Sequence, residues 1–282
     1  MGCLVISPVG TSLLANFVSA SRSGCSYCAE VVEVFKDRGV EEWARLGLDD
    51  DRNRFPDGLL CSFVKGTPVF DALLRFVRDY GSRSCAELSG LSAIVSSYLL
   101  DPRETTVLLL PTRTCNSMLC ARVLEEFLRE SYRGVEVVPL RMVGSEDDFE
   151  EFAIEVLDRV VKRVVDERRR GVRVFVNASP GFKAEVSFLV LASILGGASA
   201  VVYIHEAFRK GVSLPIPPIA IDREYVSKLL GVFGDRQCID KGEATAALSD
   251  EELAVARDRG VIYERKGLVC LRKWVRKLLE LG

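Results

Sequence analysis

The sequence predicts an α/β protein built on a mainly parallel sheet that helices cover on both faces. Two observations lead to this prediction: strand patterns alternate with helix patterns between residues 106 and 204, and those strands are continuously apolar. Continuously apolar strands are typical of a sheet buried on both faces, and the alternation favours parallel connections. The predicted strands lie at 3–7, 106–110, 135–140, 172–177 and 198–204. The helices predicted with them lie at 13–19, 89–100, 115–131, 146–170 and 182–195.

The strand at 172–177 ends in a turn whose chemistry suits an anion. The turn formers Asn177 to Gly181 separate it from a helix pattern that begins at Phe182. A strand that ends in a Ser/Gly turn and opens a helix directs backbone N–H groups and the positive end of the helix dipole to one point. Lys183 lies in the first helical turn, where the dipole disfavours a cation, so a bound anion would account for it. The alternative is an ordinary turn with a solvated lysine.

A second strand–turn–helix with small polar residues lies at the N-terminus. Gly10 follows the first strand, and Thr11 or Ser12 can cap the next helix, which is the plain structural alternative. Ligands of open α/β sheets bind at the carboxyl ends of the strands, at the topological switch point. If the first strand is central and the 172–177 strand adjoins it, both turns line one crevice. The turn at 112–116 then lies on the same rim.

The character of the sequence changes after Pro215–Pro218, and we predict two domains, 1–220 and 221–282. Helix patterns at 225–233 and 249–257, a hairpin that turns at Lys266–Gly267 and a closing helix are typical of a small winged-helix-like module. Acidic residues almost balance its charge, so we favour a dimerisation or lid role, and DNA binding stays possible. Its basic end consists of Arg265, Lys266, Arg272, Lys273, Arg276 and Lys277.

The composition excludes several classes of protein. The chain has 282 residues, 48% of them hydrophobic and 28% charged, which is a globular balance and not that of a disordered chain. A net charge of −2 gives the chain as a whole no basic footprint for nucleic acid. No apolar run is long enough to cross a bilayer, and no signal-peptide pattern is present, so we expect a cytoplasmic protein with no membrane partner.

The nine cysteines are scattered, and Cys25-x-x-Cys28 invites a zinc or redox interpretation. A zinc site usually needs a second pair of ligands, and the single histidine, His205, is far away in the sequence. We therefore expect buried free thiols, with a disulfide as the alternative, and neither a metal nor a cofactor. Three adjacent aspartates at 49–51 are interpreted as a solvated charge run.

The two turns carry the motifs of a known family. Val9-Gly-Thr-Ser-Leu-Leu-x-Asn16, together with Asn177-x-Ser-Pro-Gly-Phe-Lys183 after a later strand, resembles the CARF domains of type III CRISPR systems. The archaeal CRISPR-associated ring nucleases are the nearest likeness, and it spans roughly residues 1–220. The family usually has a glycine or threonine pair before Gly-x-Lys, so Ser179-Pro180 is a mild departure.

The resemblance implies a Rossmann-like homodimer that binds cyclic oligoadenylate, mainly cyclic tetra-adenylate, across its two-fold axis in antiviral defence. A two-fold ring on a two-fold dimer lets each subunit present the same turns to half of the ligand. In ring nucleases the serine of the first motif and the lysine of the second carry the activity, and they match Ser12 and Lys183. Arg113 carries over more weakly as a phosphate contact. The resemblance assigns ligand binding to Gly10, Thr11, Asn16, Asn177, Ser179, Gly181 and Phe182.

The chemistry that the resemblance implies needs few protein groups. A 3′–5′ RNA linkage carries its own nucleophile, the ribose 2′-hydroxyl, so an enzyme must hold it in line and stabilise the charge on phosphorus. Ser12 and backbone amides can supply the positioning, and Lys183 the cation. The product would end in a 2′,3′-cyclic phosphate. Because the sequence shows no general base, we expect slow turnover, which suits the removal of a signal.

Other classes of function fit less well. CARF proteins with an attached HEPN RNase carry an Arg-x4-6-His motif, but His205 has no arginine at that spacing. Neither the G-x-G-x-x-G nor the G-x-x-x-x-G-K-[ST] pattern of nucleotide-binding enzymes is present. A regulator that senses the ring and binds DNA through its C-terminal module is the main alternative, and salt-dependent DNA binding would favour it. His205 ends the last strand and can contact the ligand or be structural.

Overall fold

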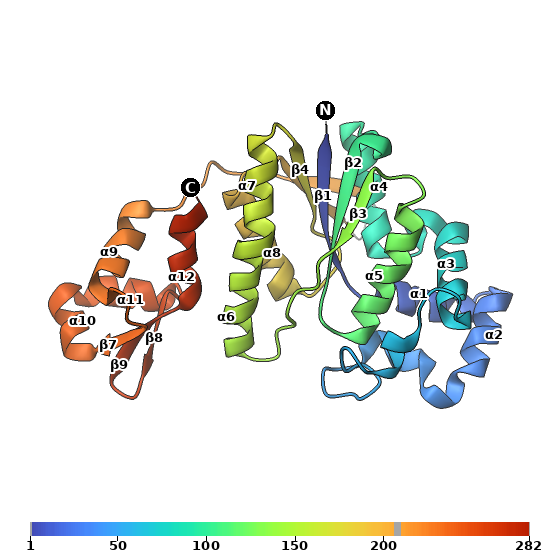
Figure 1. Cartoon of the computed structure of the whole chain (residues 1–282), viewed down its shortest axis with the longest axis horizontal. Helices are drawn as coiled ribbons and strands as arrows, with labels where there is room; N and C mark the ends of the chain where they lie inside the picture. Colours follow the sequence, from blue (N-terminus) through green and yellow to red (C-terminus); the bar gives the residue numbers. More distant parts are fainter. Residues whose placement is uncertain (1, 206–209, 282) are drawn as a thin grey trace.

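The computed structural model describes residues 2–205 and 210–281 and shows a mixed α/β protein (Figure 1). The main sheet has six strands in the order β3-β2-β1-β4-β5-β6. Strands β1 to β5 are parallel, and β6 is antiparallel to β5. They lie at Cys3–Val9 (β1), Thr105–Pro111 (β2), Gly134–Val137 (β3), Arg173–Asn177 (β4), Ala200–His205 (β5) and Lys210–Leu214 (β6). The predicted fold class is confirmed, and the sheet is consistent with a Rossmann-like fold.

Strand β1 is central and adjoins β4, which is the condition for the two turns to share one rim. It pairs with β2 from Cys3 to Val9 and with β4 from Cys3 to Ile6. The strand therefore continues beyond its predicted end at residue 7, because the ladder with β2 runs on after the ladder with β4 has ended. The carboxyl ends of β1 and β4 lie side by side at the point where the strand order reverses, which is the usual ligand site of such sheets.

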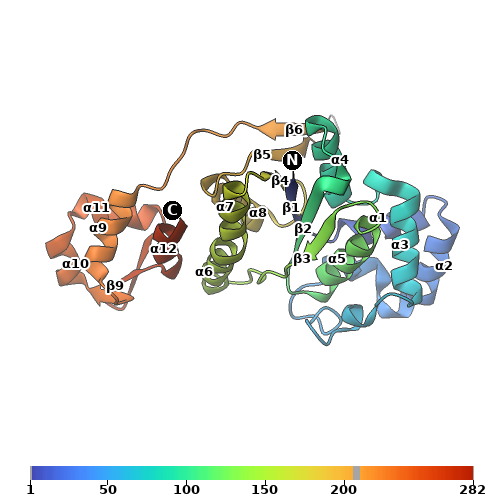
Figure 2. The ribbon, with the colours of Figure 1, turned by 45° about the horizontal axis from the view of Figure 1, so that its top comes forward.

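Helices cover both faces of the sheet (Figures 1 and 2). Side chains alternate along β1: Val5 and Val9 belong to one buried core, and Leu4 and Ile6 to the other. The first core is covered by α1 (Ser12–Ser21), α2 (Ser26–Val34), α3 (Pro68–Tyr80), α4 (Ala86–Tyr98) and α5 (Cys115–Leu128). The second is covered by α6 (Glu146–Glu155), the π-helical segment Val156–Val161, α7 (Lys162–Arg169) and α8 (Lys183–Leu195).

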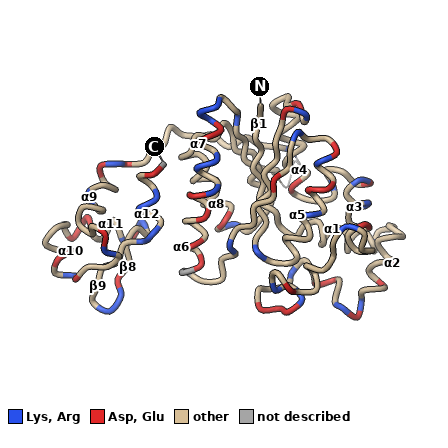
Figure 3. The backbone as a smooth tube through the Cα atoms, viewed as in Figure 1, with Lys and Arg blue, Asp and Glu red and all other residues tan. Residues whose placement is uncertain are grey.

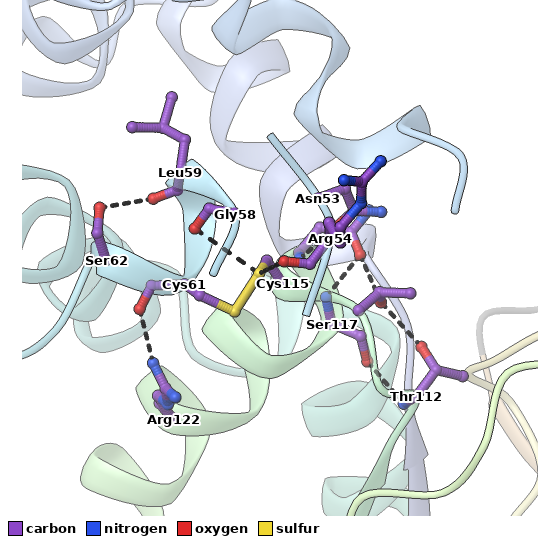
Figure 4. Close-up of a disulfide and its surroundings, with 12 residues drawn as sticks. Asn53, Arg54, Gly58, Leu59, Cys61, Ser62, Thr112, Cys115, Ser117 and Arg122 are labelled. Carbon is purple, nitrogen blue, oxygen red and sulfur yellow. Dashed lines mark hydrogen bonds between the residues drawn. A yellow bond between two sulfur atoms is a disulfide. The ribbon is translucent and has the colours of Figure 1, made fainter. Parts of the chain in front are cut away.

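Residues 21–98 contain helices and short 3₁₀ segments and are anchored by a disulfide (Figure 4). Cys61 in the 3₁₀ segment Leu59–Ser62 is bonded to Cys115, the first residue of α5. Two further disulfides are Cys25–Cys28 and Cys238–Cys270. The expectation of free thiols is therefore wrong for these six cysteines and holds for the buried Cys3, Cys85 and Cys120. The fold brings Cys61 and Cys115 together from distant segments, and spacing alone does not reveal this.

The C-terminal segment, residues 221–281, has a sheet and a core of its own. Its core includes Leu229, Phe233, Ile239 and Leu271. The hairpin turns at Lys266–Gly267, as predicted, and both residues have positive φ. Strand β7 and helix α10 are additions to the predicted pattern. The elements are α9 (Arg223–Phe233), β7 (Cys238–Asp240), α10 (Lys241–Ala247), α11 (Asp250–Asp258), β8 (Ile262–Arg265), β9 (Leu268–Leu271) and α12 (Lys273–Lys277), with the strand order β7-β9-β8.

Helix α12 docks the C-terminal segment onto α6. The backbone N–H of Lys273 donates to the Glu150 carboxylate, and the Lys273 ammonium lies 3.1 Å from Glu151. Lys277 lies 3.1 Å from Asp158, and the rings of Trp274 and Phe188 meet edge to face with centroids 6.4 Å apart. Figure 3 shows basic residues of α12 beside acidic residues of α6. Part of the basic end predicted from the sequence is thus paired within the chain.

Candidate functional site

The two predicted turns meet at the carboxyl ends of β1 and β4. A Cβ atom on Gly10 would lie 3.4 Å from the backbone nitrogen of Gly181. Gly181 has a φ of +99°, and a Cβ there would lie 2.8 Å from Cγ2 of Val186, so this position requires glycine. The floor of the site is therefore made of backbone, where the two turns lie side by side.

The start of α8 presents two exposed side chains at this floor. Phe182 is the N-cap residue and is 55% exposed, and Lys183 is the first residue of the helix. Among the residues that the structure describes, the Lys183 ammonium has no ion-pair partner. A free cation and the N–H groups of a helix start, side by side, can bind an anion, and the exposed ring can stack on a base.

Ser12 does not cap α1, although it is the first residue of that helix. Its hydroxyl accepts a hydrogen bond from the backbone N–H of Ala86 (3.0 Å) and donates one to Oε2 of Glu87 (3.2 Å). The backbone N–H of Gly10 donates to Oε1 of the same carboxylate at 2.7 Å. Glu87 is only 2% exposed. Hydrogen bonds from the start of α4 therefore hold the turn at Gly10 to Ser12 in place.

Two neighbours of Ser12 hold α1 in place. The Thr11 hydroxyl donates to the carbonyl of Ala44 at 2.8 Å, and the Asn16 amide donates to the carbonyl of Ser84 at 3.0 Å. Neither Thr11 nor Ser12 makes a side-chain capping bond to α1. These polar side chains have tertiary partners, so the capping alternative does not account for them.

Asn177 lies at the centre of the polar network beneath the site. It is fully buried, and its amide donates to the Ser7 hydroxyl (3.0 Å) and to the carbonyl of Glu87 (3.1 Å). Its carbonyl oxygen accepts from the backbone N–H of Ser179 at 3.3 Å. The Ser179 hydroxyl in turn accepts from the backbone N–H of Ile204 at 2.8 Å. Asn177 thus ties the second turn to α4 and β1.

The rim carries a small apolar cleft beside Gly181. Its volume is about 30 Å³, and Thr112, Phe182 and Glu185 are among the residues that line it. Thr112 therefore lies on the shared rim, as predicted. Burial raises the pKa of the Glu185 carboxyl above its ordinary value. The hydrogen bond from the backbone N–H of Val143 lowers that pKa, but by less than burial raises it. Arg113 points to α6, where its guanidinium lies 2.7 Å from the Glu155 carboxylate.

The Cys61–Cys115 disulfide adjoins the turn at 112–116, which forms part of this rim (Figure 4). The Asn53 side chain accepts a hydrogen bond from the N–H of Asn116 at 2.8 Å, and its backbone carbonyl accepts from the N–H of Cys115 at 3.0 Å. The backbone N–H of Thr112 donates to the Ser117 hydroxyl at 3.1 Å. These bonds fix the turn between β2 and α5, which carries Arg113.

Sequence reasoning missed Glu87 and Gly90, both in α4. A Cβ on Gly90 would lie 1.9 Å from Oδ1 of Asn177, so the glycine leaves room for that amide. A glycine within a helix pattern was the available signal for Gly90. Glu87 precedes the predicted helix and belongs to no motif, so only the fold connects it to Ser12.

His205 is the last residue of β5, the strand next to the edge strand β6, and its side chain is exposed. Residues 2–205 and 210–281 contain no group of three or more histidine, cysteine or acidic side chains placed to hold a metal ion. No helix within those residues is both long and apolar enough to span a membrane.

A comparison with protein families matches part of the chain. Residues 82–217 match the family model described as CRISPR-associated protein (Cas_APE2256). The matched segment contains α4 with Glu87 and the second turn with Lys183, whereas Gly10 and Ser12 precede it. The part of this chain that runs from α4 to β6 is therefore similar to a CRISPR-associated family.

Proposed function

We propose that the chain is a ring nuclease that binds and cleaves cyclic oligoadenylate, with cyclic tetra-adenylate as the favoured ring, in type III CRISPR signalling. The observation that carries the proposal is the meeting of the Ser12 turn and the Lys183 turn on a backbone floor at the switch point. The similarity of residues 82–217 to a CRISPR-associated family supports the biological setting.

The site suits a phosphodiester of such a ring. Lys183 and the N–H groups at the start of α8 offer positive charge to a phosphate, and Phe182 offers a ring face to an adenine. The ribose 2′-hydroxyl attacks the adjacent phosphorus, and the leaving 5′-oxygen departs, so the product ends in a 2′,3′-cyclic phosphate. The reaction requires no cofactor.

We propose two domains, 1–220 and 221–282, and a homodimer that places its two sites about one ring. The separate cores of the main sheet and of the C-terminal segment support the division. A two-fold dimer offers a ring with two-fold symmetry the same pair of turns twice, so each subunit would hold half of the ligand.

The test is to incubate the purified chain with labelled cyclic tetra-adenylate in EDTA, alongside Ser12→Ala and Lys183→Ala. Linear di-adenylate with a cyclic phosphate end, made by the wild type and lost in Lys183→Ala, supports the proposal. Ser19→Ala on the exposed face of α1 and Lys162→Ala at the start of α7 are matched controls that retain cleavage. Tight binding of an intact ring points to a sensor, and no binding rules out this ligand class.

A ring-sensing regulator that binds DNA through its winged-helix-like C-terminal domain is the second candidate. Two exposed cations, Arg265 and Lys266, at the β8–β9 turn favour it, and neither has an ion pair among the described side chains. Helix α11 opposes it, because Asp250, Glu251 and Glu252 would face the DNA phosphates with like charge. DNA binding that falls steeply with salt and changes with the ring would favour this candidate.

A further inference from the structure

We propose that Glu87 is the proton acceptor of the ring-cleavage reaction and acts through the Ser12 hydroxyl as a positioning residue. This inference rests on the proposed function. The sequence shows no general base for that reaction, and the structure places a buried carboxylate directly behind Ser12. Oε2 of Glu87 lies 3.2 Å from the Ser12 oxygen.

The hydrogen bonds around Ser12 fix the direction in which its hydroxyl points. The Ser12 oxygen accepts from the backbone N–H of Ala86 and directs its own proton to the Glu87 carboxylate. A hydroxyl has one donor and two acceptor positions, so one lone pair remains. Ser12 can therefore accept a proton from a ligand hydroxyl, but it has no proton left to donate to a phosphate.

The surroundings of Glu87 keep its carboxylate in one place. Oε1 accepts from the backbone N–H of Gly10 at 2.7 Å, and the residue lies in the first turn of α4, where the helix dipole favours a negative charge. No lysine or arginine among the described residues forms an ion pair with it. Hydrogen bonds thus hold the carboxylate in place, with Oε1 on Gly10 and Oε2 facing Ser12.

The proton balance of the step is simple. The ribose 2′-hydroxyl gives its proton to the Ser12 oxygen as its own oxygen bonds to phosphorus, and Ser12 passes its proton to Glu87. The bond from phosphorus to the 5′-oxygen breaks, and that oxygen takes a proton from water at the exposed Lys183 end of the site. Glu87 returns its proton to water when the product leaves. No redox partner is required.

A proton acceptor and a purely structural residue predict different results when Glu87 is replaced. If Glu87 accepts the proton, its replacement affects ring binding and ring cleavage in opposite directions. In Glu87→Gln the amide oxygen can still accept from Gly10, while the amide N–H₂ faces Ser12 as a donor. The Ser12 hydroxyl then turns its proton outward to the phosphate, and one negative charge near a polyanion is lost. Ring binding should hold or tighten by about threefold, and single-turnover cleavage should fall by about 100-fold.

The experiment measures the dissociation constant and the single-turnover cleavage rate for cyclic tetra-adenylate with wild type, Glu87→Gln and Glu167→Gln. Glu167 in α7 is also buried, but its carboxylate pairs with Arg163 and takes no part in the site, so its variant serves as the matched control. The Ser12→Ala/Glu87→Gln double variant should be no slower than Ser12→Ala, because the proton path already ends at Ser12.

A proton inventory on the wild type in mixtures of H₂O and D₂O gives a test that needs no variant. Two protons in flight predict a curved dependence of rate on deuterium content, and a straight line overturns the proposal. If Glu87→Gln cleaves at the wild-type rate, or loses binding and cleavage to the same extent, the role of Glu87 is overturned. Neither result overturns the proposed nuclease itself. A ring left intact by the wild type overturns the proposed nuclease and this inference together.

Discussion

Single residues in α4 set the positions of both turns of the candidate site. Gly90 leaves the space that the Asn177 amide fills, and Asn177 reaches from β4 to the Ser7 hydroxyl on β1. A glycine inside a helix costs about 1 kcal/mol relative to alanine. The helix bears this cost at Gly90 because a methyl group there would displace the amide that connects the strands.

We expect Gly90→Ala to lower the free energy of unfolding by about 1–3 kcal/mol, because overpacking at Asn177 outweighs the gain in helix propensity. Gly231→Ala in α9 is the matched control, since a Cβ at Gly231 meets nothing within 4 Å. The control should gain about 1 kcal/mol. Urea unfolding of both variants gives the answer, and a gain in stability at both positions would contradict the packing argument.

The pH dependence of stability should carry a contribution from Glu185. Burial raises its pKa in the folded protein, so the folded state binds more protons than the unfolded state between the ordinary glutamate pKa and the raised value. Stability therefore falls as the pH rises through that window. In Glu185→Gln this fall should be absent. The stability of the variant relative to the wild type should therefore be higher above that pH window than below it.

Thermal unfolding of wild type and Glu185→Gln across mildly acidic to neutral pH tests the sign. The glutamine side chain can still accept from the Val143 N–H, so a constant difference between the two proteins at every pH would show a packing effect instead.

Among the elements, the segment from the 3₁₀ turns to α5 depends on its disulfide to hold the rim. Cys61 and Cys115 are separated by 54 positions, whereas Cys25 and Cys28 are separated by 3. In the chain-entropy view a disulfide stabilises more when it closes a longer loop. The Cys61–Cys115 bond also holds the start of α5, directly after the turn that carries Arg113.

Replacement of Cys61 and Cys115 by serine should lower the free energy of unfolding by about 4 kcal/mol, and the same change at Cys25 and Cys28 by about 2 kcal/mol. Chemical unfolding under non-reducing conditions compares the two double variants. Equal losses would show that loop length does not govern the effect. Thiol titration of the unfolded wild type, which should find three free thiols, checks the pairing first.

The elements that sequence patterns predict well are the buried ones. Strands β1, β2 and β4 are continuously apolar and were located within a few residues. Strand β6 was missed because it is an edge strand with mostly exposed side chains, and β7 because it has only three residues. The same limit holds for the candidate site: turn chemistry predicts Gly10, Ser12 and Lys183, whereas Glu87 reaches Ser12 only through tertiary folding.

For the whole molecule, the docking of α12 on α6 decides where the C-terminal segment lies. Exposed ion pairs such as Lys273–Glu151 contribute at most about 1 kcal/mol each. Burial of a large aromatic side chain contributes more, about 1.5–3 kcal/mol. The contact of Trp274 with Phe188 and its neighbours should therefore stabilise the docked arrangement more than the ion pairs do.

We expect Trp274→Ala to release the C-terminal segment and to make the connection at 215–222 more sensitive to proteolysis. The double variant Glu151→Lys/Asp158→Lys should have a smaller effect, one that shrinks as salt screens the new repulsion. Limited proteolysis and small-angle scattering at low and high salt compare them. A larger effect from the charge variant would reverse the ranking of the two forces.

The central place of β1 also bears on how the chain is made. Strand β1 is synthesised before both of its sheet partners, because Cys3 pairs with Thr105 and Arg173. It can therefore pair on both sides only after β4 has been made. Contacts between such distant residues slow folding, and an unpaired apolar strand is prone to aggregate. During synthesis the nascent chain should therefore depend on chaperones until β4 has emerged.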